Sequence, residues 1–307
     1  MILPAASKIL ALADSNGWQS CTGKTREERS EDGQFFTPPA IARCLAEWFQ
    51  AEGFNRPSLH LLDPGAGGGG GVLTAALVER IVALCESGVL PELKEVTLEV
   101  WELDEAFLPA LRQNLATCSE ALRQAKIRTT LQLHHGSYIE GAVRALDSGL
   151  FGAAPTPKVT HAILNPPYRK IVTRSRERAL LATVGIETSN LYSAFVSLAL
   201  RQVADGGELA AITPRSFCNG PYFREFRREL MRSANFHRIH VFDSRAEAFC
   251  RDQVLQENIL FHLIRGKPDR AALTVSTGSL EAPVKSCVPR DRFVSASDPD
   301  QVIHIAT

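Results

Sequence analysis

The chain has 307 residues, 45% of them hydrophobic, and is long enough to bury a full core as one large domain or one domain with an appendage. The formal net charge is +0, so no global field indicates a polyanionic partner, although residues 160–270 contain 17 Lys or Arg against 11 Asp or Glu. Seven scattered cysteines form no Cys-x-x-Cys pair, and no apolar run reaches the roughly 20 residues that span a membrane. We therefore expect a soluble, cytoplasmic protein with reduced thiols and no disulfide framework, zinc site or signal peptide.

The first part of the chain predicts a helix, a polar segment and a second helix. Residues 4–15 have the pattern of a short amphipathic helix, whereas residues 16–34 are polar and rich in turn formers. Thr37 precedes two prolines that suit a first helical turn, and apolar residues then recur at helical spacing over 38–51. We treat residues 1–34 as an N-terminal helix and polar segment that precede the main domain.

A strand, a glycine-rich loop and a helix follow in close succession. Residues 58–63 predict a short buried strand, a loop with five consecutive glycines at 67–71 follows Asp63, and helical periodicity resumes over 72–85. Glycines let the backbone approach a ligand closely, and the N-terminus of the next helix offers free amides. The pattern is typical of the first unit of a nucleotide-binding α/β domain. A flexible linker is the alternative, and the regular elements on both sides argue against it.

A second strand is predicted over 95–104, before a helix over 105–117. This strand ends in carboxylates, and a carboxylate at that place is positioned to bind ribose hydroxyls. From the residues alone, either Glu102 or Asp104 meets this requirement, and a solvated strand end is the alternative interpretation.

The third and fourth strands, predicted over 129–135 and 159–164, lead to the most distinctive turn of the chain. The fourth strand ends at the sequence Asn165-Pro166-Pro167-Tyr168. Two prolines after a strand force a rigid turn, which here presents an amide oxygen, carbonyls without local partners and an aromatic face. Such groups suit an amino group on a planar ring, and the turn falls where open α/β sheets bind ligands. An ordinary Pro-Pro loop is the plain alternative.

The rest of the chain continues the alternation. An arginine-rich stretch at 169–189 is either a solvated loop or a lid that contacts phosphates. A helix over 190–204, ended by Asp205-Gly206-Gly207, precedes a strand over 208–213. The elements that follow are a helix at 222–233, with Arg224, Arg227, Arg228 and Arg232 on its polar side, strands at 236–242 and 255–264, and weak strand signals over 266–307. At least five crossovers favour an α/β fold with a mainly parallel sheet, helices on both faces and a late antiparallel hairpin.

With these loops in this order, the chain resembles the S-adenosylmethionine-dependent adenine-specific DNA methyltransferases. In particular, it is similar to the gamma-order N6-adenine enzymes of restriction–modification systems. The resemblance covers roughly residues 33–265. It rests on Phe35-Phe36-Thr37-Pro38-Pro39, on Asp63-Pro64-Gly65-Ala66-Gly67, on Glu102-Leu103-Asp104 and on Asn165-Pro166-Pro167-Tyr168.

The resemblance implies a class I S-adenosylmethionine-dependent methyltransferase fold, with a catalytic domain at 35–265 and a C-terminal extension at 266–307 that begins a target-recognition region. S-adenosyl-L-methionine is the implied cofactor, and no metal is implied. The implied catalytic residues are Asn165, Pro166, Pro167 and Tyr168. The implied cofactor-binding residues are Phe36, Thr37, Asp63, Pro64, Gly65, Ala66, Gly67, Glu102, Leu103, Ser137 and Tyr138, where Ser137 or Tyr138 replaces the family's usual Asp or Asn. The implied substrate-binding residues are Phe249, Arg169 and Lys170.

The implied reaction is site-specific methylation of adenine N6 in double-stranded DNA, as host-protective modification. The target adenine is flipped out of the duplex and stacked by Tyr168 and Phe249. The side-chain oxygen of Asn165 and the carbonyl of Pro166 accept the hydrogens of its amino group, which then attacks the methyl group in line. The implied partners are the DNA and a restriction endonuclease or specificity partner.

The chain departs from the family in two respects. The glycine run is about two residues too long, so we expect Gly70 and Gly71 to loosen the following helix and weaken cofactor binding. Only about 40 residues follow Arg265, so DNA recognition is minimal, is supplied by a partner, or belongs to a longer protein.

Other functions are compatible with the same motifs. A protein-glutamine or RNA adenine N-methyltransferase also fits the fold and the Asn-Pro-Pro-Tyr turn. A non-catalytic subunit that binds cofactor or DNA is the alternative from a different class, and the lengthened glycine loop is its sign. A dehydrogenase is disfavoured because it leaves the turn unexplained.

Overall fold

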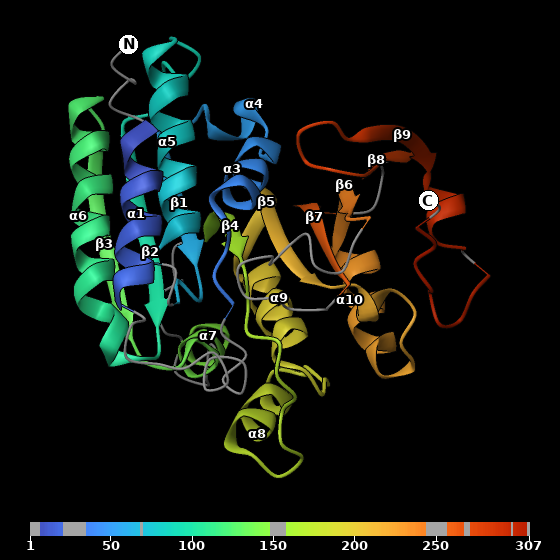
Figure 1. Cartoon of the computed structure of the whole chain (residues 1–307). Coiled ribbons are helices and arrows are strands. Elements are labelled where there is room, and N and C mark those ends of the chain that lie inside the picture. The colour runs from blue at the N-terminus through green and yellow to red at the C-terminus, as the bar shows by residue number, and fades with distance from the viewer. Residues whose placement is uncertain are drawn as a thin grey trace.

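The central sheet sets the positions of the loops that the sequence singles out (Figure 1). The computed structural model describes residues 7–20, 35–67, 70–147, 158–243, 257–266, 271–295 and 297–305. Within these ranges, nine strands form one sheet in the order β3-β2-β1-β4-β5-β7-β6-β8-β9. Their bounds are β1 Ser58–Asp63, β2 Glu95–Glu102, β3 Arg128–His135, β4 Val159–Leu164, β5 Val203–Pro214, β6 Ala234–Val241, β7 Asn258–Arg265, β8 Ala272–Thr277 and β9 Val284–Pro289.

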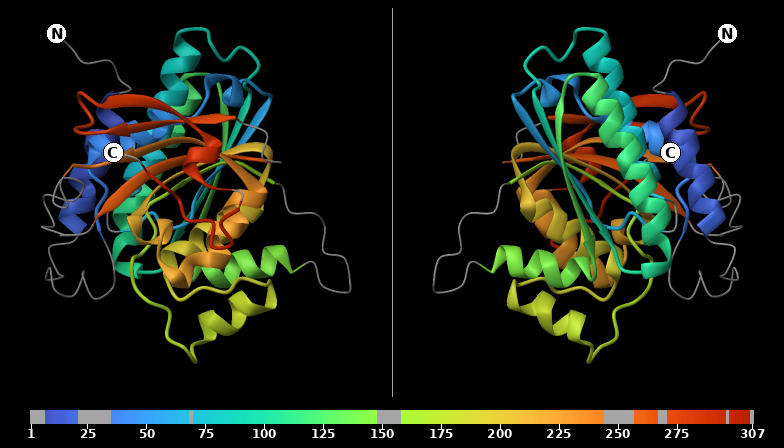
Figure 2. Two further views of the ribbon diagram at one scale, coloured as in Figure 1. Left: turned by 90° about the vertical axis from the view of Figure 1, so that its right-hand side faces the viewer. Right: turned by 90° about the vertical axis from the view of Figure 1, so that its left-hand side faces the viewer.

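Helices cover both faces of the sheet (Figure 2). One face carries α1 Ser7–Ser20, α3 Pro39–Trp48, α4 Ala51–Phe54, α5 Val72–Glu86 and α6 Leu108–Gln124. The other carries α7 Tyr138–Leu146, α8 Arg176–Thr183, α9 Leu191–Gln202, α10 Arg224–Ser233 and the short α11 Arg290–Phe293. Successive strand residues alternate between the two cores: Leu61 packs with the first group, and Leu62 with the second. This alternation is expected where both faces of a sheet are buried.

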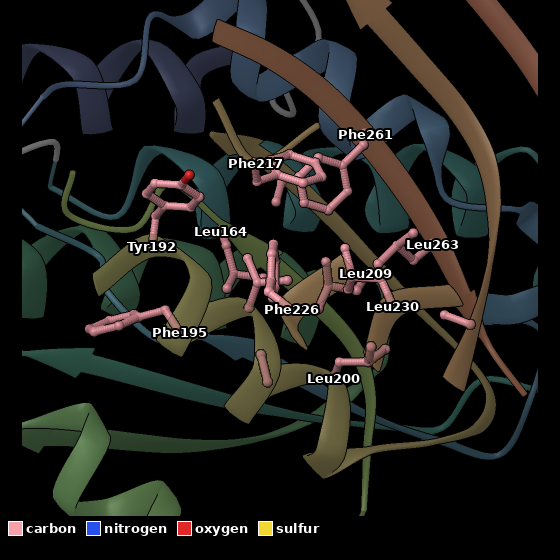
Figure 3. Close-up of a cluster of buried hydrophobic side chains, with 14 of the residues drawn as sticks. Leu164, Tyr192, Phe195, Leu200, Leu209, Phe217, Phe226, Leu230, Phe261 and Leu263 are labelled. Atoms are coloured by element: carbon pink, nitrogen blue, oxygen red, sulfur yellow. The ribbon is translucent and has the colours of Figure 1, made fainter. Parts of the chain in front are cut away.

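The larger core lies between the sheet and helices α9 and α10 (Figure 3). The ring of Phe217 lies 5.4 Å from that of Phe226 and 5.7 Å from that of Phe261, both in edge-to-face contact. Tyr192 and Phe195 lie together at one end of this cluster in Figure 3. Through Phe195 the core reaches the pocket described below, whereas Tyr192 contacts the ring of Tyr168 behind it.

The strand order places the glycine loop and the Asn-Pro-Pro-Tyr turn side by side. β1 pairs in parallel with both β2 and β4, so the strand order reverses on either side of it. The loops that leave β1 and β4 therefore emerge at the same carboxyl edge, which is the usual ligand site of such sheets. β5 and β6 each pair antiparallel with β7. The predicted α/β class, with a mainly parallel sheet and a late antiparallel pair, is confirmed.

Several predicted boundaries are wrong near the N-terminus. α1 continues to Ser20, so residues 16–20 are helical and do not belong to a polar surface segment. The predicted helix over 38–51 is two helices, because Phe49 and Gln50 adopt extended backbone conformations between α3 and α4.

Other differences lie further along the chain. α9 ends at Gln202, and the predicted stop at 205–207 is instead part of β5, in which Gly206 has a φ of +76°. The stretch 169–189 contains α8, whose first turn is capped by Ser175. The C-terminal residues contribute β8 and β9 to the same sheet, and their role in target recognition stays a prediction. In the described part of the chain, no helix has the length and apolar character needed to cross a membrane.

A buried carboxylate fixes the break between α3 and α4. Glu208 on β5 is 2% exposed, and its Oε2 atom accepts hydrogen bonds from His262 Nε2 at 2.7 Å and from the Gln50 amide at 3.0 Å. Although burial opposes ionisation, the imidazole of His161, 3.7 Å away, and the hydrogen bond from His262 lower the pKa of Glu208 to about 2. The contact between Gln50 and Glu208, called here the anchor of α3, holds the C-terminal end of this helix, which begins two residues after Thr37.

Replacing Gly53 by alanine should destabilise the fold, because a methyl group at this position overlaps the Oε1 atom of Glu208. Overpacking of this kind costs about 1–3 kcal/mol, which urea unfolding measures directly. Glu52→Ala, an exposed position in the same short helix, is the control and should change the unfolding midpoint little. An unchanged midpoint in Gly53→Ala would contradict the tight packing of α4 on Glu208.

Candidate functional site

A pocket lies at the carboxyl edge of the sheet, beside the ends of β1, β2, β3 and β4. It contains about 1040 Å³ of empty space, its open mouth included. The lining residues are Phe35, Phe36, Thr37, Pro64, Gly65, Ala66, Gly67, Val72, Leu73, Trp101, Glu102, Leu103, Gly136, Ser137, Tyr138, Ile139, Asn165, Pro167, Arg169, Glu177, Leu191 and Phe195.

Most of the residues that the sequence singles out meet at this pocket. Those outside the lining are Asp63, which lies beneath the glycine loop, and Pro166, Tyr168 and Lys170 of the turn and its continuation. Phe249 lies outside the described residues. The structure thus brings together four motifs from separate parts of the chain, and the role of each residue stays a prediction.

The side-chain amide of Asn165 is held in one orientation. Its Nδ2 atom donates to the carbonyl of Phe35 and to Thr37 Oγ1, both at 2.9 Å. Because a carbonyl can only accept, the nitrogen must face Phe35, and the Oδ1 atom must face the other way. The segment before α3 therefore orients the amide of a residue on a distant loop.

Tyr168 supports the same amide from the other side. Its hydroxyl donates to Asn165 Oδ1 at 2.9 Å and lies 3.3 Å from the carbonyl of Ile212. The ring packs between Phe35, at a centroid distance of 5.3 Å, and Tyr192, at 6.4 Å. Burial raises the pKa of Tyr168 well above its usual value, so the phenol stays protonated and acts as a donor.

Asp63 ties the start of the glycine loop to the helix that follows it. The carboxylate is 2% exposed, and it accepts hydrogen bonds from Thr74 Oγ1 at 2.8 Å and from the Gly65 amide at 3.4 Å. Burial raises the pKa of Asp63 to about 6, although these hydrogen bonds favour the ionised form. Through these hydrogen bonds, Asp63 stabilises the conformation of the start of the loop.

Glu102 presents a carboxylate oxygen that is free to accept. Its Oε1 atom accepts from the Asp104 amide at 2.7 Å, whereas its Oε2 atom is buried and has no hydrogen-bond partner among the described residues. Burial raises the pKa of Glu102 to about 7. Asp104 instead caps the short 3₁₀ helix at 105–107, accepting from the Ala106 amide at 3.0 Å. Of the two carboxylates that the sequence left open, the geometry therefore favours Glu102.

The residues after β3 form a wall of the pocket. Ser137 caps α7, and its Oγ atom accepts from the Glu140 amide at 3.4 Å. Tyr138 is 2% exposed, and its hydroxyl donates to Gln202 at 2.6 Å. Both polar groups therefore already have partners in the protein.

Sequence reasoning missed two aromatic residues that line the pocket. Trp101 fits because Gly141 leaves room for its indole, and a Cβ atom at Gly141 would overlap that ring. Phe195 lies on α9, where helical periodicity assigns it only to the core, and its Cε1 atom lies 3.7 Å from a Cβ position at Gly65. The alternation of residues along β2 could have identified Trp101 as a pocket residue, but no local sequence pattern identifies Phe195.

The two arginine-rich stretches have different environments. Arg169 lines the pocket with its guanidinium 3.9 Å from Glu177, while Lys170 and Arg174 are exposed nearby. On α10, by contrast, Arg227 is only 1% exposed and donates to the carbonyls of Phe217, Gly220 and Asp300. The prediction that Arg227 lies on a polar face is therefore wrong.

The neighbours of Arg227 are also engaged by the C-terminal residues. Arg224 forms an ion pair with Asp300, and Arg228 donates to the carbonyl of Pro299 at 3.0 Å. Much of the positive charge of α10 thus holds residues 299–300 in place, which leaves the stretch beginning at Arg169 as the basic segment at the pocket mouth.

The chain is similar to methyltransferases of restriction–modification systems. Residues 161–249 match the family model of the Eco57I restriction-modification methylase. The Type II methyltransferase M.PstI of Providencia stuartii is 40% identical over 282 residues, and M.BsuBI of Bacillus subtilis is 38% identical over 284 residues. These matches cover 91% and 92% of this chain but 52% and 54% of the relatives, so the chain spans about half their length. The resemblance to restriction–modification methyltransferases is confirmed.

Solved structures share the fold. A Listeria monocytogenes protein assigned to the class I S-adenosylmethionine-dependent methyltransferases matches with a TM-score of 0.57 and 16% identity, over 80% of this chain and 67% of that one. The M protein of the type I restriction enzyme EcoKI matches with a TM-score of 0.51 and 15% identity, over 80% and 48%. The fold is that of the class I S-adenosylmethionine-dependent methyltransferases, as the sequence predicted.

Removing the carboxylate of Glu102 should change how stability depends on pH. The folded-state pKa of about 7 lies above the ordinary value, so the stability contributed by this group is full below about pH 4 and is lost as the pH rises through 7. The side chain in Glu102→Gln does not titrate. As the pH rises from about 4 to 7, the free energy of unfolding of this variant should therefore increase relative to that of the parent, by about 3 kcal/mol in total. Urea unfolding at pH 5 and pH 8 measures the difference.

Glu105→Gln is the control, because Glu105 is exposed three positions further along the chain. It should follow the parent at both pH values. A Glu102→Gln variant that also follows the parent would show that Glu102 is not an uncompensated buried acid.

Proposed function

We propose that this chain is the catalytic part of a site-specific DNA adenine N6-methyltransferase that uses S-adenosylmethionine and serves host-protective modification. The likeness to two Type II methyltransferases supports methyl transfer in a restriction–modification system. The observation that carries the proposal is the fixed amide of Asn165, in a pocket that also holds the unpaired oxygen of Glu102. The catalytic domain is proposed to span residues 35–265.

The residues of the pocket fit S-adenosylmethionine. The free Oε2 atom of Glu102 is suited to accept hydrogen bonds from ribose hydroxyls, and Leu103, 66% exposed beside it, offers an apolar contact to the adenine ring. Gly65 and Gly67 leave room for the cofactor to lie close to the backbone, and Phe36 and Thr37 line the part next to Asn165. When bound, the cofactor supplies an electrophilic methyl group on its sulfonium.

Asn165 is the proposed acceptor of a hydrogen from the target amino group. An amide oxygen has two lone pairs, and the Tyr168 hydroxyl uses one of them, which leaves the other for the substrate. The carbonyl of Pro166 is proposed to accept the second hydrogen. Together these contacts draw the nitrogen lone pair out of conjugation with the ring, so that it becomes the nucleophile. No proton needs to be moved by the protein before the attack.

The acceptor must be an unstacked base, because a ring amine inside a duplex cannot reach this turn. Tyr168, held between Phe35 and Tyr192, is the proposed stacking surface, and Phe249 is proposed to lie on the opposite face of the base. Stacking on an aromatic side chain contributes about 1–3 kcal/mol per base. A planar purine is thus favoured over the flexible side chain of glutamine.

Asn165→Ala should lower methyl transfer to adenine in duplex DNA by a factor of at least about 100, because the fixed acceptor is lost. Incubation of the 307-residue chain with labelled S-adenosylmethionine and plasmid DNA, followed by nucleoside analysis, identifies both the acceptor and the modified atom. Binding of S-adenosylhomocysteine, followed by calorimetry, should change little.

Asn219→Ala is the matched control, because Asn219 is an exposed asparagine near the end of β5. It should retain full activity. Transfer that persists in Asn165→Ala, or label found in RNA or protein and absent from DNA, would contradict the proposal.

The stretch that begins at Arg169 should contribute to binding the phosphates of DNA. Each phosphate contact adds about 0.9 to the slope of log affinity against log salt. The double variant Arg169→Gln, Lys170→Gln should therefore show a slope reduced by up to about 2 in a fluorescence anisotropy titration. Arg123→Gln, on the exposed side of α6, removes a charge elsewhere and should leave the slope unchanged. Equal effects of these variants would argue against a phosphate site at the pocket mouth.

A further inference from the structure

Gly70 and Gly71, at the end of the long glycine run, pack against the N-terminal helix α1 and against α6. Gly70 and Gly71 have φ values of +62° and +75°, in the left-handed region that favours glycine. A Cβ atom on Gly70 would lie 2.8 Å from the carbonyl oxygen of Ala13 and 3.1 Å from the amide of Gly17, both on α1. A Cβ atom on Gly71 would lie 2.9 Å from Leu111 on α6. The two glycines therefore let helices approach the loop more closely than other residues allow.

A buried asparagine links the loop to both helices. Asn114 on α6 is 2% exposed, and its Nδ2 atom donates to the carbonyl of Gly70 at 2.8 Å. Its Oδ1 atom accepts from Asn16 Nδ2 on α1 at 2.7 Å. The amide of Asn114 is thus used at both ends, and its orientation is fixed because the Gly70 carbonyl can only accept.

The same N-terminal helix contacts a second part of the pocket lining. Trp18 packs edge-to-face on Phe36 with ring centroids 4.9 Å apart, and Phe36 lines the pocket next to Thr37. Near the other end of α1, the Leu10 amide donates to Glu79 on α5 at 2.8 Å. α1 is therefore held against the glycine loop and against the Phe36 segment at the same time.

We propose that Asn114 and Asn16 are positioning residues for the methyl donor, which act by holding the end of the glycine loop against α1. This inference rests on the proposed function, because it takes S-adenosylmethionine as the ligand of the pocket. The N-terminal helix then forms part of the cofactor site, through contacts at Gly70 and Phe36. The extra glycines strengthen cofactor binding, which is the opposite of the effect expected from the sequence.

The hydrogen bonds of Asn114 show how α1 and α6 are connected to the end of the glycine loop. Without this side chain the buried Gly70 carbonyl loses its donor, and an unsatisfied buried acceptor is costly enough to shift the loop. The loop residues Gly65 and Gly67 of the pocket lie in the same short segment between β1 and α5. A shift at Gly70 should therefore weaken donor binding more than it affects the acceptor side.

The test compares Asn114→Ala, Asn16→Ala and the control Gln113→Ala, which changes an exposed residue next to Asn114 on α6. Calorimetric titration with S-adenosylhomocysteine should show a Kd about tenfold higher for Asn114→Ala and a smaller increase for Asn16→Ala. Gln113→Ala should bind like the parent. In steady-state assays the KM for S-adenosylmethionine should rise, while kcat and the KM for DNA stay the same.

A merely structural role predicts a different result. It would lower the fraction of folded protein, seen as reduced calorimetric stoichiometry, but would leave the Kd of the folded molecules unchanged, and this outcome would overturn the inference. Because Asn16 is only half-buried, its variant tests the link even if Asn114→Ala does not fold. An unchanged Kd in Asn16→Ala would then overturn it.

Gly70→Ala provides a further arm, since its methyl group crowds both the backbone of α1 and the Nδ2 atom of Asn114 without removing any hydrogen-bonding group. A raised Kd for S-adenosylhomocysteine supports the inference, and a lowered Kd overturns it in favour of the loosening effect expected from sequence. A parent chain that binds no S-adenosylhomocysteine at all would instead refute the proposed function, and the inference would fall with it.

Discussion

The site depends on one side-chain amide whose nitrogen is held by two acceptors. Asn165 follows β4, and its partners Phe35 and Thr37 lie 130 and 128 positions earlier in the chain. These hydrogen bonds fix the orientation of the amide, so the proposed reaction requires no reorientation of Asn165 when the base arrives. The anchor of α3 on Glu208 and the hydroxyl of Tyr168 support the same arrangement from two further directions.

Two buried acid groups at the pocket cost the protein stability when they ionise. Asp63 and Glu102 are both almost fully buried, and desolvation raises the pKa of each above its ordinary range. Asp63 recovers part of this cost through Thr74 and the loop amide, whereas one oxygen of Glu102 recovers none within the described structure. Unpaired buried acceptors of this kind are typical of ligand sites, where the ligand supplies the missing donor.

The two arginine-rich stretches look alike in the sequence but have different environments in the folded protein. The arginines at the start of α10 bind carbonyls and carboxylates near the C-terminal end of the described chain, and Arg227 is buried in doing so. The stretch from Arg169 onward lies instead at the pocket mouth, next to the turn that is proposed to hold the base. Charge that is used internally cannot also neutralise phosphates, so a count of arginines overestimates the basic surface available for the proposed contacts with DNA.

The sequence by itself determined the alternation of strands and helices, the class of fold and the loops at which a ligand would bind. Those features depend on local patterns: hydrophobic periodicity, glycine and proline at strand ends, and the carboxyl-edge rule for parallel sheets. Only the tertiary structure favoured Glu102 over Asp104, ended α9 at Gln202, extended α1 to Ser20 and buried Arg227. The cap formed by Asp104 is a local contact, whereas in the other three cases the deciding contact comes from a distant part of the chain or from the cover that packing provides. Periodicity within a short window contains no information about either, and for that reason the packing of α1 against Gly70 could be seen only in the folded protein.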